Sequence, residues 1–549
     1  MEICKLRFWL SLIVDEEDFY QIKPLPNLDY KIVCGDSLLS VEKDLFNQDA
    51  FNKLEQLKPI HFNETNPRKK QELRRQIDSL IFEITKGHKE FDFEVYFSEV
   101  FHKKKGFDII IANPPYIQLQ KAKNERQKYA DLYKEQNFEV FDRTGDIYCL
   151  FYEKGIKILR ENGLLAFITS NKWMRAGYGE KLRKFFTKHH PLLLIDLGPG
   201  VFESATVDTN ILLIRKLDNS SFQSEKSFAT LAVTLQKEDK SDIVRALKEK
   251  GVLLNKLSKD AWFIGSDAEQ RLKEKIEKIG KPLKDWDVKI YRGVLTGLNE
   301  AFIIDTEKRN EILANCKDED EHRRTEAIIK PILRGRDIKR YYYEWAGLWV
   351  IVIPAGWTNE NRHKENPETF IQMTFPSLME YLKQFETKAR KRDDQGDYWW
   401  ELRPCAYYPE FEKEKVVYGQ FRKGEFAYDE QKMFLSSNEY MIVGKYLKYI
   451  LALINSKTAY KYQTFISNNL SGQTTIAQKD IFINLPLPPI TTSNEPFSKQ
   501  IESLVDKILA EKKQNPAADT IPWEREIDKL VYRLYDLTEE EIKIIEGGK

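Results

Sequence analysis

The sequence lacks the features that would assign its 549 residues directly to several large classes of protein. Its five cysteines contain no CxxC pair, so the sequence signals neither a zinc site nor a disulfide framework, and we expect no bound metal. It has no run of about 18 apolar residues, so we expect no membrane span. The N-terminus has no small-residue cleavage site of the secretory kind. These absences predict a protein of the reducing cytoplasm. The cysteines are Cys4, Cys34, Cys149, Cys316 and Cys405.

The sequence also lacks an excess of charge of either sign. Its 87 lysines and arginines nearly balance its 86 aspartates and glutamates, which leaves a formal net charge of +1. Binding to nucleic acid would therefore have to rely on local basic patches and not on the overall charge. Aromatic residues reach 12%, which is enough to supply stacking platforms as well as core side chains.

Apolar periodicity indicates strands alternating with helices in the first 216 residues. Helices are expected at 1–14, 64–90 and 145–161. The stretch 30–40 is expected to hold a short strand, a glycine turn and an aspartate. Buried strands are expected at 107–112, 163–170, 192–198 and 209–216. Such alternation predicts a doubly wound α/β sheet.

The composition changes after Lys216. Residues 217–284 read as a linker followed by a charged helical segment. Strands and turns dominate 285–490, which indicates a second domain of mixed α/β type. Residues 491–549 carry two amphipathic helices. We therefore expect a first domain over 1–216, a second over 285–490, and helices at the C-terminus.

The stretch "FDIIIANPPY" (107–116) ends an expected buried strand with an amide, two prolines and an aromatic ring. Proline fixes its own φ and restricts the residue before it, so Asn113 should be held extended at the carboxyl end of the strand. Ligands of open α/β sheets bind at that edge. The side-chain oxygen of Asn113 and the backbone carbonyl oxygen of Pro114 would then be two rigidly held acceptors beside the ring of Tyr116. A strand-ending loop without chemistry is the alternative.

Two such acceptors suit the methylation of an amino group on a base. The lone pair of the adenine N6 atom is delocalised into the ring. Acceptors that bind its two hydrogens favour a more tetrahedral nitrogen, whose lone pair can attack a methyl sulfonium. Positioning and electrostatics would then contribute most of the catalysis. The base must leave the duplex to reach this site, and an aromatic face can replace the stacking that it loses.

Several stretches resemble the TaqI-like adenine-N6 DNA methyltransferases, especially those of type IIG restriction–modification enzymes. "GFDIIIANPPY" is similar to the family's catalytic motif, "VCGDSL" to its segment that contacts S-adenosylmethionine, and "LGPGVFESATVDTNILLIRK" to a later motif with a base-packing Phe. "IIKPILRGRDIKRY" resembles the entry to the family's target-recognition domain, and "SGQTTIAQKDIFINLPLPPI" its end. The resemblance implies a partial Rossmann-like methyltransferase sheet, then a mixed α/β target-recognition domain over 285–490, then C-terminal helices.

The resemblance also implies a role for each matched position. Asn113, Pro114 and Tyr116 would be catalytic, and Tyr116 and Phe202 would stack on a target adenine flipped out of double-stranded DNA. Asp36 would contact the adenine of the cofactor S-adenosylmethionine. The structural alternatives are a helix cap for Asp36 and a core position for Phe202.

Basic residues interleaved with aromatic ones in the second domain are candidates for DNA contacts. We expect them to contact mainly phosphates, with fewer residues reading bases, although a solvated surface is the alternative. The four candidates are Arg334, Arg336, Lys339 and Arg340, and the run "KARKR" (388–392) resembles them in composition.

The sequence departs from the family at its start. The family has a Gly-containing cofactor loop after its first strand and an acidic residue after its second, and neither motif is found here. Its sheet order is 3-2-1-4-5-7-6, and only strands 3 to 7 are recognisable. The resemblance thus implies an N-terminally truncated fragment, inactive alone, that binds the cofactor weakly and exposes the apolar face of its first helix. An upstream chain would complete the catalytic domain.

The leading hypothesis is therefore a site-specific adenine-N6 DNA methyltransferase of a restriction–modification system, present as a fragment. The alternative is a catalytically incomplete DNA-binding remnant that retains only sequence recognition. A third hypothesis, methylation of a protein glutamine, fits less well, because those enzymes are compact and lack a basic second domain of this size.

Overall fold

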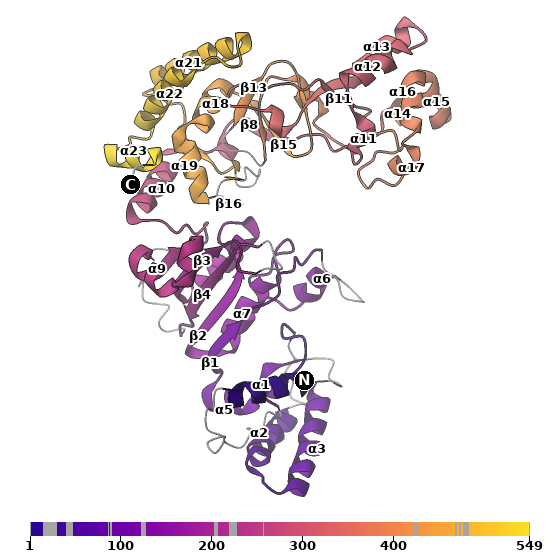
Figure 1. The fold of residues 1–549 in the computed structure, drawn as a ribbon. Coiled ribbons are helices and arrows are strands. Elements are labelled where there is room, and N and C mark those ends of the chain that lie inside the picture. The colour runs from indigo at the N-terminus through magenta and orange to yellow at the C-terminus, as the bar shows by residue number, and fades with distance from the viewer. Residues whose placement is uncertain are drawn as a thin grey trace. The chain divides into compact units, whose positions relative to one another are not determined.

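The computed structural model divides into two compact units, Met1–Ser266 and Asp267–Lys549 (Figure 1). The division falls within the segment 217–284 that the sequence indicated as linker and helix. The structure describes residues 2–14, 30–39, 48–85, 87, 91–121, 128–202, 207–218, 228–255, 257–420, 425–466, 469–470, 474–475 and 482–547. Much of the predicted linker, including 219–227, lies outside the described residues.

A six-stranded sheet forms the centre of the first unit, with the order β1-β2-β4-β3-β5-β6. The strands are β1 (Phe107–Ala112), β2 (Leu159–Ser170), β3 (His190–Gly198), β4 (Thr209–Arg215), β5 (Thr230–Thr234) and β6 (Val252–Leu254). β1 pairs with β2 in parallel, and β4 runs antiparallel between β2 and β3. The neighbours β1-β2-β4-β3 reproduce the order 4-5-7-6, which confirms the part of the expected topology that concerns these four strands. β5 and β6 extend this sheet past Lys216 and were not recognised in the sequence.

β1 is a strand, but the prediction that it is buried is wrong. Among the strands that the structure describes, it lies at the edge of the sheet and pairs with β2 alone. The side chains of Ile109 and Ile111 are 59% and 79% exposed. Burial of a parallel strand requires neighbours on both sides and helices on both faces. Among the described residues β1 has a neighbour on one side only, so its apolar sequence does not give it a buried position.

The short strand expected within 30–40 is also absent from the described part of that stretch. Residues 30–39 form turns and bends. A strand needs a partner for its backbone hydrogen bonds, and the sheet ends at β1 without one for this segment. The turn that holds Asp36 therefore lies outside the sheet.

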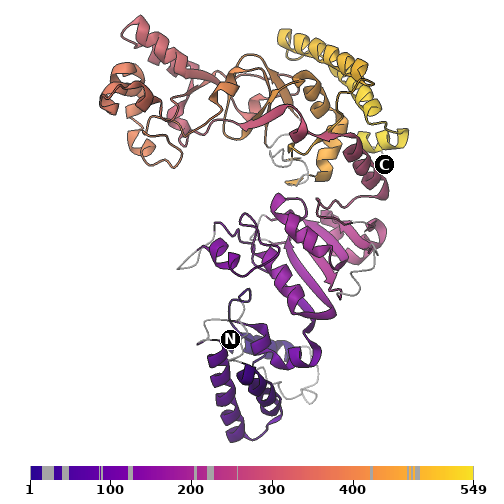
Figure 2. The same cartoon turned by 180° about the vertical axis from the view of Figure 1, so that it is seen from behind.

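Helices of the first unit lie around the sheet and in a separate group at the N-terminus (Figures 1 and 2). α1 (Glu2–Val14), α2 (Gln48–Asn63), α3 (Pro67–Ile84), α4 (Phe93–Tyr96) and α5 (Ser98–Lys104) precede β1. α6 (Tyr129–Lys134), α7 (Tyr148–Ile158), α8 (Glu180–Phe186) and α9 (Ile243–Lys250) follow it. Asn66 caps α3 by accepting hydrogen bonds from the N–H groups of Arg68 and Lys69, with Pro67 at the first helical position.

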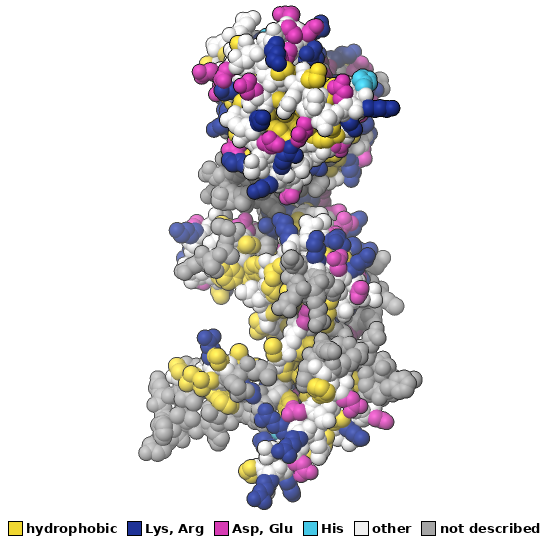
Figure 3. Space-filling model, turned by 90° about the vertical axis from the view of Figure 1, so that its right-hand side faces the viewer, with side chains coloured by type: hydrophobic (Ala, Val, Ile, Leu, Met, Phe, Trp, Pro, Cys, Tyr) yellow, Lys and Arg dark blue, Asp and Glu magenta, His cyan; other side chains and the backbone are white. Residues whose placement is uncertain are grey.

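The first helix exposes apolar side chains, which confirms the expectation for its apolar face. Ile3 is 71% exposed, and Leu6 and Leu10 are each about half exposed. Isolated apolar residues on a surface are ordinary, but a helix with this many favours contact with another surface. Figure 3 shows apolar side chains grouped on the surface of the first unit.

The second unit contains two four-stranded sheets around one large core. One sheet has the order β14-β10-β11-β9, and the other β13-β12-β15-β8. The strands are β8 (Val288–Arg292), β9 (Ile303–Asp305), β10 (Ile329–Leu333), β11 (Leu348–Ile351), β12 (Lys415–Gly419), β13 (Phe426–Asp429), β14 (Phe434–Leu435) and β15 (Glu439–Gly444). Side chains from both sheets share one apolar cluster, which unites them in a mixed α/β domain, as predicted.

Helices complete the second unit both within its chain and at its C-terminal end. α14 (Trp357–Asn361), α15 (Pro367–Thr374), α16 (Pro376–Lys383) and α17 (Glu386–Ala389) are inserted between β11 and β12. The two predicted C-terminal helices correspond to α21 (Glu495–Gln514) and α22 (Ile521–Leu534), and a third, α23 (Glu539–Glu546), follows them. Within the described ranges, no helix is both long and apolar enough to cross a bilayer.

Candidate active site

The Asn113–Tyr116 turn lies directly after β1, at the carboxyl end of the strand. The segment that follows it is fixed to the start of α7. Gln118 forms a bridge with Asp146, and the Ile147 N–H donates to the carbonyl oxygen of Ile117 at 2.9 Å. The turn is therefore held at both ends, by the sheet on one side and by the residues before α7 on the other.

The amide oxygen of Asn113 is held in place by Tyr116. The Tyr116 hydroxyl donates to Asn113 Oδ1 at 3.0 Å, and the carbonyl oxygen of Ile168 on β2 lies 3.3 Å from the same hydroxyl. Burial raises the pKa of Tyr116, so the hydroxyl stays protonated and remains a donor. The side chain of Asn113 is exposed whereas Pro114 is buried. An amide oxygen has two lone pairs, so Asn113 can still accept a hydrogen bond from a ligand.

The ring of Tyr116 contacts two other aromatic residues. Tyr148 lies edge-on to it, with ring centroids 6.0 Å apart and an interplanar angle of 85°. Phe202 lies 6.4 Å away at 63°. The structure thus brings together Asn113, Tyr116 and Phe202, three of the residues that the sequence indicated. Tyr116 and Phe202 are inclined to each other and form a corner, not a parallel sandwich.

Three residues behind Tyr116 were not recognised in the sequence. The Tyr148 and Tyr178 hydroxyls are 2.8 Å apart, and the Tyr178 hydroxyl donates to Asp146 Oδ2 at 3.1 Å. Asp146 is only 8% exposed, and burial raises the pKa of its carboxyl group. Asp146 and Tyr148 lie in the short pattern "GDIY" (145–148) and Tyr178 lies 30 residues further on, so no single motif singles out the three. This network fixes the face of Tyr148 against which Tyr116 rests.

The loop before Phe202 is shaped by two glycines in the left-handed region. Gly198 has φ +61° and Gly200 has φ +75°, values that other residues adopt at a cost. Asp196 organises the start of this loop, because its Oδ1 atom accepts from the Gly198 N–H at 3.2 Å and from Asn171 Nδ2 at 3.0 Å. Residues 203–206, which follow Phe202 in the matched motif, lie outside the described residues.

Asp36 lies on the turn at 30–39, and each oxygen of its carboxylate accepts one hydrogen bond. Oδ1 accepts from the Leu38 N–H at 3.1 Å, and Oδ2 accepts from the Tyr133 hydroxyl at 2.8 Å. These bonds join Asp36 to α6 and not to Asn113. The Leu38 contact has the form of a local turn bond, and no helix cap by Asp36 is present in the described part of this segment.

A mostly apolar cavity of about 370 Å³ lies beside the open edge of β1. Its walls come from β1, from α7 and from Phe167 on β2, and Ser37 and Phe93 contribute from the preceding segment. Lys154 also lines it, and burial lowers the pKa of this lysine. Ser37 and Lys154 are the polar side chains of its described lining, and the remaining walls offer few partners for a charged methionine group.

The four basic candidates of the second unit differ in whether their side chains are already bound to other residues of the chain. Arg334 is bound by both oxygens of Asp337, with Nε–Oδ2 and Nη2–Oδ1 distances of 3.0 and 2.9 Å. Arg340 is paired with Glu524 of α22. Lys339 donates to the carbonyl oxygen of Arg336 at 3.0 Å. The Arg336 side chain is exposed and has no partner among the described residues, which makes it the freest of the four.

The side chains of the "KARKR" run (388–392) do not all lie on the surface. Arg392 is 7% exposed and stacks on Phe302, with its guanidinium carbon 4.4 Å from the ring centroid. Its Nη2 atom donates to the carbonyl oxygens of Trp399 and Glu401 at 2.6 and 2.9 Å. Arg392 therefore holds the domain together and is not accessible to DNA.

Comparison with known proteins identifies two segments. Residues 1–202 match the Eco57I restriction-modification methylase family, and residues 330–487 match the TaqI-like C-terminal specificity domain. The first match contains the turn after β1, and the second contains most of the two sheets of the second unit.

Curated relatives and a solved structure agree with these matches. The type II restriction enzyme and methyltransferase RM.Eco57I of Escherichia coli is 25% identical over 78% of this chain and 46% of its own length. The type II methyltransferase M.BstVI of Geobacillus stearothermophilus is 22% identical over 80% of this chain and 75% of its own. The fold resembles that of the Type IIL restriction–modification enzyme MmeI, solved with DNA, with a TM-score of 0.54 at 11% identity over 86% of this chain and 63% of that one. The chain thus spans about half the length of the first of these relatives.

Proposed function

We propose that this chain, a homologue of the type II restriction–modification methyltransferases with an Eco57I methylase domain and a TaqI-like specificity domain, methylates adenine N6 in DNA. The observation that carries the proposal is the Asn113–Tyr116 turn, whose amide oxygen is oriented by a hydroxyl and open to a ligand. S-adenosylmethionine, the cofactor of such enzymes, would supply the methyl sulfonium. The target would be an adenine flipped out of double-stranded DNA.

The residues of this chain would act by accepting hydrogen bonds and not by removing a proton before the transfer. Asn113 Oδ1 and the Pro114 carbonyl oxygen would each accept a hydrogen bond from the adenine amine, and the methylated nitrogen would then lose one proton to solvent. The bond from Tyr116 leaves one lone pair of Asn113 Oδ1 for this purpose. Fixed acceptors need no reorganisation as positive charge develops on the nitrogen, which lowers the barrier.

Tyr116 and Phe202 would hold the flipped base. Because their planes are inclined by 63°, we propose that the base stacks on Tyr116 while Phe202 covers one edge. Tyr148 supports Tyr116 from the side and limits its rotation. Stacking of this kind compensates for the stacking energy that the base loses on leaving the duplex.

Asp36 is the residue that we assign to the cofactor. Its carboxylate has lone pairs beyond those used by Leu38 and Tyr133, so it can accept from the adenine amine of S-adenosylmethionine. Other contacts to the cofactor would have to come from elsewhere, because the cavity beside β1 is mainly apolar.

We further propose that another polypeptide segment pairs in parallel with the open edge of β1. Three observations support the pairing of such a segment with β1: a strand edge that no described residue pairs with, the exposed side chains of Ile109 and Ile111, and an adjacent apolar cavity. Without that segment, the described residues would bind S-adenosylmethionine weakly, and methyl transfer would be slow or absent. The open edge also favours the second candidate function, a DNA-binding protein that recognises a sequence without methylating it.

One experiment tests these proposals together. Transfer of labelled methyl groups to duplex DNA is measured for the chain alone and for the product of its whole genomic locus, which includes any segment encoded there that covers β1. The modified nucleosides are then identified by mass spectrometry. The proposal expects N6-methyladenine with the product of the locus and little with the chain alone. Methylated cytosine, methylated protein glutamine, or no product from the locus would contradict it, and DNA binding without product would support the second candidate.

A further inference from the structure

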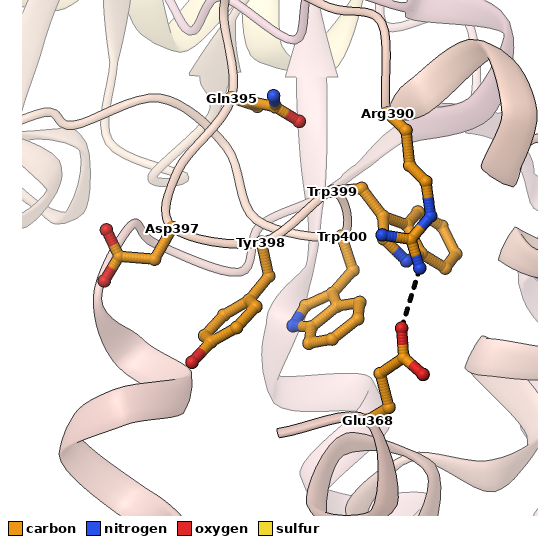
Figure 4. Close-up of a pocket in the computed structure, with 7 residues that line it drawn as sticks. All are labelled: Glu368, Arg390, Gln395, Asp397, Tyr398, Trp399 and Trp400. Atoms are coloured by element: carbon orange, nitrogen blue, oxygen red, sulfur yellow. Dashed lines mark hydrogen bonds and ion pairs between the residues drawn. The ribbon is translucent and has the colours of Figure 1, made fainter. Parts of the chain in front are cut away.

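Three consecutive aromatic residues, Tyr398, Trp399 and Trp400, line a cavity of about 170 Å³ in the second unit (Figure 4). The rest of the lining consists of Glu368, Arg390, Gln395 and Asp397. Tyr398 and Trp400 stack with centroids 4.9 Å apart and planes 8° apart, whereas Trp399 and Trp400 meet at 76°. The aromatic walls therefore form a corner, with charged and amide groups around it.

One polar atom of this aromatic corner has no partner in the part of the chain that the structure describes. The Tyr398 hydroxyl donates to Asn359 Oδ1 at 2.7 Å, and Trp400 Nε1 donates to Thr358 Oγ1 at 3.0 Å. Trp399 is 6% exposed, and its indole N–H finds no acceptor among the described residues. A buried donor without an acceptor costs about 1–3 kcal/mol. Native proteins rarely leave such a group unmet, so an acceptor from outside the described chain is expected.

Charge argues against a phosphate as the source of that acceptor. Arg390 lies near Trp399, with its guanidinium carbon 5.8 Å from the ring centroid. Its Nη2 atom is 2.7 Å from Glu368 Oε1, and its Nε atom donates to Glu386 at 2.9 Å. Two carboxylates thus neutralise the one cation of the cavity, and Asp397 adds a further negative charge. An anion would be repelled here, whereas a neutral, flat and polar ring would not.

We propose that this cavity binds a single nucleobase. The ring would lie against one aromatic wall and offer an acceptor atom to the indole N–H of Trp399. Its amino or ring N–H groups would donate to the free oxygen of Glu368 or to the amide oxygen of Gln395. Stacking plus hydrogen bonds to the edge of the ring is how proteins hold an unpaired base. The site depends on the proposed DNA-binding function only for the source of the base, which is either DNA or a free nucleoside.

The test compares the full chain with the variant Trp399→Phe, which keeps an aromatic ring and removes the N–H. Binding is measured by fluorescence anisotropy for single-stranded oligonucleotides and for matched abasic oligonucleotides that keep the phosphates. Free deoxynucleosides are measured by tryptophan quenching. We expect Trp399→Phe to weaken binding of base-bearing ligands about five- to tenfold, the value of one hydrogen bond, and to leave abasic binding unchanged. Trp345→Phe is the matched control, because the Trp345 N–H already bonds to the Leu348 carbonyl oxygen in the same unit.

Each outcome shows whether the bound base comes from DNA or from a free nucleoside, or shows that the cavity binds no base. A loss seen only with oligonucleotides assigns the pocket to a base of DNA, and a loss seen with nucleosides alone assigns it to a free base and leaves the proposed methylation untouched. Gln395→Ala serves if Trp399→Phe melts early, since the Gln395 side chain is half-buried and makes no hydrogen bond within the described ranges. Equal losses for abasic and base-bearing ligands, or no loss with either variant, would overturn the proposal and leave the N–H to an ordered water.

Discussion

The side-chain oxygen of Asn113 is the atom on which the proposed chemistry depends. The two prolines after it made its rigid position predictable from sequence, because their restriction of the backbone is local. The bond from the Tyr116 hydroxyl was not predictable in the same way. It arises because the turn folds the ring back toward β2, where the Ile168 carbonyl oxygen also lies within reach. Local residues fixed the acceptor, and tertiary contacts fixed its orientation.

Substitutions at the turn should separate acceptor, orientation and stacking. Asn113→Ala removes the acceptor, so methyl transfer should slow by about a hundredfold or more with little change in DNA affinity. Tyr116→Phe removes only the orienting bond and should slow transfer about fivefold, the effect of about 1 kcal/mol. Tyr116→Ala should also weaken binding of the flipped base. Single-turnover kinetics of a form that shows methyl transfer measures all three, and a near-normal rate for Asn113→Ala would remove this residue from the mechanism.

His189 should make the free energy of unfolding depend on pH. Burial, helped by the nearby lysines Lys216 and Lys188, lowers the pKa of His189 from 6.5 to about 4. The folded state therefore favours the neutral ring, and stability that is present above pH 6.5 is lost as the pH falls toward 4. The free energy of unfolding should drop by about 2–3 kcal/mol more over this range in the native protein than in His189→Gln. Urea titrations at a series of pH values measure the difference, and parallel curves would refute it.

At the scale of elements, apolar runs located the strands of the first sheet well but not their exposure. β2, β3 and β4 appear where periodicity placed them, because their sequences suit a strand with neighbours on both sides. β1 has an equally apolar sequence and stands at the edge. Periodicity describes what a segment could bury, whereas actual burial depends on which segments lie beside it. The same limit explains the turn at 30–39, whose strand-like sequence has no partner strand among the described residues.

A buried ion pair joins β12 to β13 and should be essential to the second unit. Lys415 Nζ lies 2.6 Å from Asp429 Oδ2, and both side chains are fully buried. The other oxygen of Asp429 accepts from the Tyr343 hydroxyl at 3.0 Å. Lys415→Ala would leave a buried carboxylate without its cation, so the free energy of unfolding should fall by about 3–5 kcal/mol.

Chemical denaturation of Lys415→Ala, followed by circular dichroism, measures this loss. The double variant Lys415→Met with Asp429→Asn should recover part of it, because an amide keeps an acceptor without a charge. Calorimetry supplies the control, since the transition of Asp267–Lys549 should shift while that of Met1–Ser266 stays in place. A change below about 1 kcal/mol would show that solvent reaches the pair.

For the whole molecule, near-neutral charge and paired arginines limit how DNA can be bound. The sequence predicted basic patches from composition alone, but two of its four candidate residues, Arg334 and Arg340, are already paired with carboxylates. Composition cannot show pairing, because the partners lie elsewhere in the fold, as Glu524 does for Arg340. Arg336 is left as the freest cation of the four.

Salt dependence should reveal how many phosphates are contacted. DNA affinity of the full chain should fall with salt, with a logarithmic slope of about −0.9 for each phosphate neutralised. Arg336→Ala should make this slope shallower by about one such unit, whereas Arg392→Lys, a change at a buried site, should leave the slope unaltered in protein that remains folded. Anisotropy titrations at several salt concentrations measure the slopes, and an affinity independent of salt would exclude a phosphate-based interface.

The open edge of β1 also bears on how the protein behaves at high concentration. A bare strand edge presents unpaired N–H and C=O groups that another chain can join, and Ile109 and Ile111 add an apolar surface beside it. Unless that edge is covered, the chain should form aggregates whose amount grows with concentration and with heating. Ile111→Lys, a charge of the kind that natural edge strands carry, should reduce light scattering without altering the fold. The same strand that presents Asn113 would then also be the place where this association between chains begins.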